Sequence, residues 1–194
     1  MRADALLNVT RALKARLQSA LTPTYQNPSV FVGPLDDSDS RGAHLILFLY
    51  RIAANASLRN RERRVPSADA PKVDVFQNSF PLDLHFLLTV GTTPSSDSEE
   101  LLLQALGLAI QTLQSSAELT GPELDHETVR VTFEPLTTEE ASRIWALFPT
   151  ANYRTSVAYV ASPVWIDPQQ PSEAAVPVSD NQLSSGNKPR ELST

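Results

Sequence analysis

A nine-residue run from Leu82 to Val90 constrains the fold more than any other part of the chain. Its residues alternate between two sets, an apolar one of Leu82, Leu84, Phe86, Leu88 and Val90 and a mixed one of Asp83, His85, Leu87 and Thr89. Successive side chains of a strand point to opposite faces, so the alternation predicts a strand with one fully apolar face. The chain must therefore supply further strands that pair with this one in a sheet.

Three helices are predicted around this strand. The first follows Asp4 as its cap, ends before Pro23 and has an apolar stripe at steps of three and four: Leu6, Val9, Leu13, Leu17 and Leu21. The second runs from Asp97 to about Ser116, with acidic residues at the positive end of its dipole. Its stripe is Leu102, Leu103, Leu106, Ala109, Ile110 and Leu113. The third is short; it begins at Thr137 and Glu140, which have capping-box spacing, and closes at Pro149.

The remaining strands predict the fold class. They cover residues 29–33, 44–54, 72–76, 129–133 and 153–160, the last with a possible extension over 162–166. The first two are predicted to pair as a hairpin. Because strands cluster early in the chain, a simple doubly wound parallel sheet is disfavoured. We expect an α+β fold, with a mixed, mostly antiparallel sheet of about five strands flanked by helices.

The C-terminal part of the chain has a different composition. From Asp167 onward it consists largely of Pro, Ser, Gln, Asn and Glu. Such a segment buries too little apolar surface to offset its ordering entropy. We therefore predict one domain over residues 1–166 and a disordered tail over residues 167–194.

Composition excludes several classes of protein. The 194 residues carry 16 basic and 22 acidic side chains, and this net charge of −6 argues against a general nucleic-acid binder. Cysteine is absent, which excludes disulfides, thiol catalysis and cysteine metal sites. No apolar run reaches the roughly 18 residues of a membrane helix, and residues 1–4 lack the apolar core of a signal peptide. A soluble, cytosolic protein is expected.

The charges are unevenly distributed along the chain. Residues 1–72 hold 11 basic and 6 acidic side chains, whereas residues 73–194 hold 5 and 16. Two poles of opposite sign could contact copies of the same chain or charged neighbours. Alternatively, folding mixes the two halves in space.

Asp83 and His85 are the first candidate site, since they share a strand face two residues apart. They could form a catalytic dyad or hold a metal ion. No third ligand or nucleophile can be identified, and no HExxH, Walker, GxGxxG or GxSxG motif occurs. The alternative is an ordinary polar strand face, partly solvated or at an interface.

The segment over residues 55–72 is the second candidate and is predicted as a long exposed loop. It carries Arg59, Arg61, Arg63 and Arg64. A basic loop can bind phosphate or an acidic protein surface, or it can simply be solvated. No aromatic residue lies among the arginines, which disfavours a platform for single-stranded nucleic acid.

The two tryptophans are the third candidate. Tryptophan is favoured as an anchor of protein interfaces. Trp145 lies next to Ile144 and Leu147, which favours core packing. Trp165 lies at the edge of the predicted tail, where core and interface are equally compatible with the sequence.

Three stretches together resemble one family. They are residues 81–90 after the arginine-bearing segment, residues 136–148 with Leu-Thr-Thr-Glu-Glu leading to Ile-Trp-Ala-Leu-Phe, and residues 153–159 with Tyr-Arg-Thr-Ser-Val-Ala-Tyr. In this order and spacing they resemble the N-terminal domain of the cap, or tail-terminator, proteins of extracellular contractile injection systems. These phage-tail-like particles are typified by the Photorhabdus virulence cassette and the antifeeding prophage. The resemblance covers roughly residues 4–167.

The resemblance implies a structural role without catalysis, metal, nucleotide or other cofactor. Six copies would form a ring on the last layer of inner tube and sheath, stop polymerisation and fix particle length. The implied partners are copies of the chain and the inner-tube and sheath proteins, with no nucleic acid and no membrane insertion. The chain would be made in the bacterial cytoplasm and would belong to a particle that can be released. An accessory adaptor or tail-completion protein of the same kind of particle is the alternative.

A ring needs contacts between two different patches of neighbouring copies. We expect the arginine segment to cross such a boundary towards carboxylates such as Glu99, Glu100 or Glu139. The predicted interface residues are Arg59, Arg61, Arg63, Arg64, Asp83, His85, Glu139 and Trp165.

Overall fold

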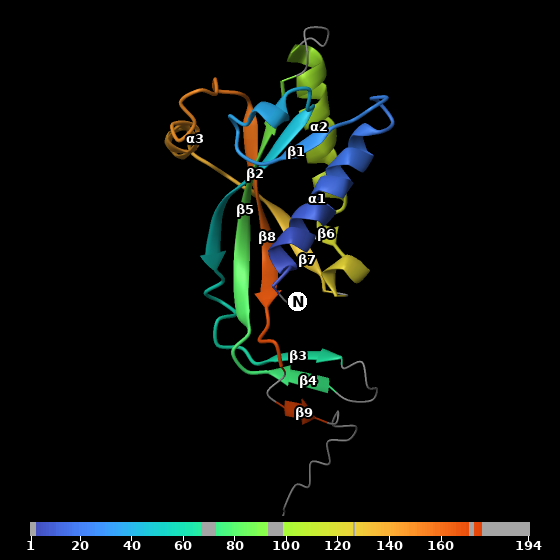
Figure 1. Cartoon of the computed structure of the whole chain (residues 1–194), viewed down its shortest axis with the longest axis vertical. Coiled ribbons are helices and arrows are strands. Elements are labelled where there is room, and N and C mark those ends of the chain that lie inside the picture. Colours follow the sequence, from blue (N-terminus) through green and yellow to red (C-terminus); the bar gives the residue numbers. More distant parts are fainter. Residues whose placement is uncertain (1–2, 67–72, 93–98, 126, 171–172, 176–194) are drawn as a thin grey trace, which may run out of the picture.

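A curled six-stranded sheet forms the centre of the molecule (Figure 1). The computed structural model describes residues 3–66, 73–92, 99–125, 127–170 and 173–175. The strands lie in the order β1 (Val30–Val32), β2 (Leu45–Ala54), β5 (Phe80–Val90), β8 (Ser156–Ile166), β7 (Val129–Glu134) and β6 (Glu118–Leu119). Only β1 and β2 pair in parallel. The predicted α+β class with a mixed, mostly antiparallel sheet is confirmed.

The helices cover the two faces of this sheet (Figure 1). On one face, α1 (Ala5–Leu21) and α2 (Glu99–Ser115) enclose the larger core. On the other face, the short α3 (Thr138–Trp145) closes a smaller core of Leu35, Ile46, Leu87, Trp145, Phe148 and Ala158. The chain thus has two cores on opposite faces of the same strands.

The alternation over residues 82–90 explains why β5 is the central strand. Its apolar set lies in the larger core, and Leu87 of the mixed set lies in the smaller one. The predicted strand face is confirmed. Both faces are covered because β5 lies between β2 and β8, under helices on either side.

The predicted helices are found where their stripes place them. The stripe of α1 is buried except for Leu6, which is half-buried, while Asp4 holds the cap position without a side-chain cap bond. In α2, Leu106, Ala109 and Leu113 are buried, but Leu103 is 45% exposed. This leucine was predicted as part of the buried stripe and is the main error in the helices.

A capping box starts α3, as predicted. The Thr137 hydroxyl accepts the backbone N–H of Glu140 at 3.2 Å, and the Glu140 carboxylate accepts the backbone N–H of Thr137 at 2.9 Å. These hydrogen bonds hold the pKa of Glu140 below its usual range. An eight-residue helix has little stability of its own, so the cap and the smaller core must hold it.

Two strand predictions need correction. The segments around β1 and β2 do not form a hairpin, because residues 33–44 return the chain to the end from which β1 started, and Val30 lies opposite Leu45 in parallel register. The last strand begins at Ser156, three residues later than predicted, and Tyr153 is 65% exposed. Its extension over residues 162–166 is confirmed.

A second, three-stranded sheet lies beyond the lower ends of β5 and β8 (Figure 1). It consists of β3 (Arg63–Pro66), β4 (Val73–Phe76) and β9 (Glu173–Ala175), all antiparallel. The predicted loop over residues 55–72 therefore contains a strand, since Arg63–Pro66 pairs with β4. Within the predicted tail, Asp167 accepts hydrogen bonds from Arg63 and Ser79, and residues 173–175 form β9. Residues 171–172 and 176–194 of this tail lie outside the described residues.

Candidate interaction surface

Three of the four predicted contact arginines are exposed. Arg59 and Arg61 line an open hollow of about 480 Å³, together with residues 77–79. Within the described residues neither guanidinium forms an ion pair. Arg64 pairs with the neighbouring Glu62 at 3.0 Å, and both side chains are largely in water. Arg59 and Arg61 thus present positive charge without an ion-pair partner among the described residues, on the segment that leads into β3.

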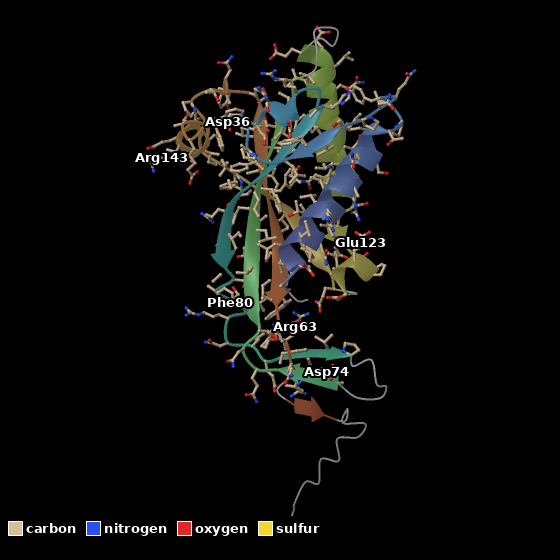
Figure 2. The ribbon with its side chains drawn as sticks, in the orientation of Figure 1. Asp36, Arg63, Asp74, Phe80, Glu123 and Arg143 are labelled. Atoms are coloured by element: carbon tan, nitrogen blue, oxygen red, sulfur yellow. The ribbon has the colours of Figure 1, made fainter. Side chains whose placement is uncertain are left out.

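Arg63 differs from its neighbours because its side chain is only 5% exposed. Its guanidinium donates to Glu127 and, at 2.8 Å, to Asp167, and it lies 5.2 Å from the ring centre of Trp165. The Ser79 hydroxyl donates a second hydrogen bond to Asp167 at 2.7 Å. Figure 2 shows Arg63 at the junction of the two sheets. It is therefore a structural connection and not an exposed contact residue.

The partners of Arg63 could not be predicted from the sequence. Glu127 is 64 residues away along the chain and Asp167 is 104 residues away. Trp165 is half-buried against the Arg63 guanidinium, but its place near the end of the last strand does not indicate this contact. Arg63 belongs to the basic half of the chain and both carboxylates to the acidic half, so folding mixes the two at this point.

Asp83 and His85 do not form a dyad. The Asp83 carboxylate accepts hydrogen bonds from the Asn55 amide at 2.9 Å and the Ser162 hydroxyl at 2.5 Å. These contacts tie the end of β2 to β5 and β8. Asp83 therefore supports the sheet.

His85 belongs to a separate cluster, of which it is the buried member. Its Nε2 lies 3.0 Å from the Arg51 guanidinium, and its Nδ1 lies 2.8 Å from the Glu134 carboxylate. A guanidinium can only donate, so Nε2 accepts and Nδ1 carries the proton that it donates to Glu134. Tyr50 donates to the same carboxylate at 2.7 Å. Burial, this hydrogen bond and the charge of Glu134 raise the pKa of the Tyr50 hydroxyl.

This cluster has the chemistry of a closed polar network. Both ring nitrogens of His85 are engaged, and the ring is buried, so it has no position left for a substrate proton. Across the described part of the chain, no group of three or more His, Asp or Glu side chains could hold a metal ion. The cluster therefore links β2, β5 and β7 through side-chain hydrogen bonds.

The remaining candidates lie on or near α3 and at the end of β8. Glu139 is exposed and pairs with Arg143 at 2.6 Å, one turn along the helix. Trp145 is 5% exposed and lies in the smaller core, as its neighbours indicated. Figure 2 shows Arg143 on α3 far from Arg63 and the small sheet. Among the eight predicted interface residues, the structure places Arg63 against Trp165, and Arg59 and Arg61 on one hollow.

Comparison with known proteins identifies related folds. A family model described as the Pvc16 N-terminal domain matches residues 8–180. Comparison with curated protein sequences gives no match. Among the described residues, no helix combines the length and apolarity needed to cross a membrane.

Two solved cryo-EM structures are similar to this chain over most of its length. One is the sheath/tube terminator of an extracellular contractile injection system, PVC, in the extended state, with a TM-score of 0.60 and 18% identity over 96% of this chain. The other is the tube-terminating cap of the anti-feeding prophage, AFP, with a TM-score of 0.60 and 18% identity over 91% of this chain. This chain spans 65% and 60% of the length of those two chains.

Proposed function

The chain belongs to the Pvc16 N-terminal domain family, and on this premise we propose that it is a subunit of the cap that terminates a contractile injection system. The observation that carries the proposal is the likeness of its fold to two terminator caps over more than nine-tenths of the chain. The family match supports it independently, because it rests on sequence. The cap role is structural, in keeping with the closed hydrogen bonding of Asp83 and His85.

In this role six copies form a ring on the last layer of inner tube and sheath, stop polymerisation of both and fix particle length. The partners are copies of the chain and the tube and sheath proteins. The chain is made in the bacterial cytoplasm and is carried in the assembled particle. Two separate charged patches on one subunit support a ring, because cyclic assemblies beyond dimers use heterologous contacts.

Particle length tests the cap role. Electron microscopy of particles made with and without the gene should show a narrow length distribution with it, and variable lengths or tubes without stable sheath when it is deleted. Labelled chain should lie at one end only, in six copies. Unchanged, fully sheathed particles after deletion would reject the terminator and favour the accessory adaptor. Label along the whole sheath would reject both.

The exposed arginines are the proposed subunit contact. Arg64 belongs to β3 of the small sheet, at the lower end of the molecule, and Glu139 belongs to α3, nearer the other end (Figure 1). Arg59 and Arg61 lie in the segment that leads into β3. Contact between these patches would join neighbouring copies head to tail. Because Arg63 is buried, it is not part of this contact.

Reversing two of these charges should impair assembly without impairing folding. In the double variant Arg61→Glu/Arg64→Glu we expect the melting temperature to change little, because exposed charges contribute about 0–1 kcal/mol each. Incorporation into particles should fall clearly. The matched control is Arg11→Glu/Arg130→Glu, which reverses two exposed arginines that line neither proposed contact. Equal incorporation of both variants and the wild type would refute the contact.

A further inference from the structure

A hollow of about 430 Å³ opens at the end of the main sheet opposite the small sheet. Its wall is formed by residues 90–92 at the end of β5, by Glu99 and Leu102 in the first turns of α2, and by residues 153–155 before β8. Backbone contacts hold this wall together, since the Thr155 carbonyl accepts hydrogen bonds from the Val90 N–H and the Thr89 hydroxyl. The arginine segment and Glu139 lie outside the hollow.

Arg154 gives this hollow its chemistry. Its Nη1 is buried and has no hydrogen-bond partner within the described residues, and burial lowers the pKa of the guanidinium. Five other arginines, Arg16, Arg51, Arg63, Arg64 and Arg143, all make side-chain hydrogen bonds. Buried polar groups nearly always have partners, and arginine stays charged in proteins. An acceptor from outside the subunit would complete this group.

The surroundings of Arg154 define what that acceptor is. A single guanidinium with Glu99 on the same wall suits a monovalent anion and disfavours a phosphate dianion, which Glu99 would repel. The lining also has an apolar part, because it includes Leu102 and Tyr153, whose side chain is 65% exposed. The hollow therefore fits a carboxylate presented by a protein surface with apolar side chains nearby.

A second copy of this chain carries such a surface at its opposite end. On the small sheet, Asp74 is half-buried and makes no hydrogen bond or ion pair within the described residues. Phe80, at the start of β5, is 46% exposed. Figure 2 shows both at the lower end of the molecule. The same end carries Arg59 and Arg61, so the head-to-tail arrangement that joins them to Glu139 also brings the small sheet towards Arg154.

We propose that Arg154 is a docking site for the carboxylate of Asp74 on the small sheet of a neighbouring copy. The proposal rests on the proposed cap role and adds a second, oppositely directed ion pair to the same subunit boundary. Two antiparallel charge pairs would fix the register of neighbours in a ring better than one, because a shifted neighbour would place like charges together.

Arg154→Met separates docking from folding. Methionine keeps the apolar stem and removes an unpaired buried charge, so the melting temperature of the free chain should stay the same or rise. The amount of variant that co-purifies with particles should fall by about tenfold or more, since truncating one partner of a buried interface charge pair is costly. Wild-type incorporation, or a lowered melting temperature of the free chain, would overturn the proposal. The control variant Glu99→Gln should incorporate normally. A loss of incorporation equal to that of Arg154→Met would show that Glu99 of the same hollow is the partner of Arg154, and this result would also overturn the proposal.

A charge swap identifies the occupant. Asp74→Arg and Arg154→Asp should each reduce incorporation, and the double variant should restore it, because the swapped pair is remade at every boundary. Failure of the double variant to restore incorporation would overturn a second copy as the occupant. Absence of the wild-type chain from the particle end would overturn the cap role as well, which distinguishes that failure from failure of this contact alone.

Discussion

Replacing Arg63 by alanine is expected to lower the free energy of unfolding by about 3–5 kcal/mol. The guanidinium is 5% exposed and lies between Glu127 and Asp167, and its removal leaves two carboxylates in a poorly solvated junction without their common cation. It also removes the cation–π contact with Trp165. The loss should weaken the attachment of β3 to the end of β8. Urea unfolding followed by circular dichroism measures the change.

Arg64→Ala is the matched control, since Arg64 is the next residue of the same strand and 67% exposed. Its effect should remain within about 0.5 kcal/mol. The variant Arg63→Ala/Asp167→Asn should be less destabilised than the two single effects added together, because they share one interaction. Similar small effects of Arg63→Ala and Arg64→Ala would show that the buried ion cluster does not hold the small sheet.

Replacing Trp145 by alanine is expected to cost about 3–5 kcal/mol and to release α3. The indole is 5% exposed in the smaller core, lies 5.5 Å from the Tyr153 ring and donates to the Ser156 hydroxyl at 3.3 Å. The helix has only eight residues, so its capping box alone cannot keep it folded. Urea unfolding measures the cost, and amide hydrogen exchange of α3 measures the release.

Leu147→Ala is the control for this variant, because Leu147 lies just after the same helix and is 70% exposed. It should change the free energy of unfolding by no more than about 0.5 kcal/mol. If both variants had equal effects, or if α3 amides kept their protection in Trp145→Ala, the smaller core would not be what holds α3.

These two residues also show how far sequence reasoning reaches. Trp145 could be assigned to a core from its apolar neighbours in sequence, and Ile144 does pack against the smaller core, whereas Leu147 is exposed. Arg63 looked like its exposed neighbours Arg61 and Arg64, since nothing in its own segment marks it as buried. Only the return of Glu127 and Asp167 to the same point separates it from them.

The same contrast applies to the candidate site. Asp83 and His85 were correctly placed on the mixed face of one strand, but their proximity in sequence suggested a shared function that the structure does not have. Asp83 bonds to Asn55 and Ser162, and His85 bonds to Arg51 and Glu134. The unpaired Arg154 carried no sequence signal at all, because an arginine before a strand is ordinarily solvated.

The sequence by itself determined the elements of this protein: the three helices, the central strand with its apolar face and the α+β class. These follow from spacing within about 20 residues, because side-chain periodicity is a local property of helices and strands. The tertiary structure alone decided the parallel pairing of β1 with β2, the small sheet, the burial of Arg63 and the isolation of Arg154. Each depends on groups from distant parts of the chain meeting in one place, and the partners of a charged group are set by the packing of whole elements rather than by their neighbours in sequence.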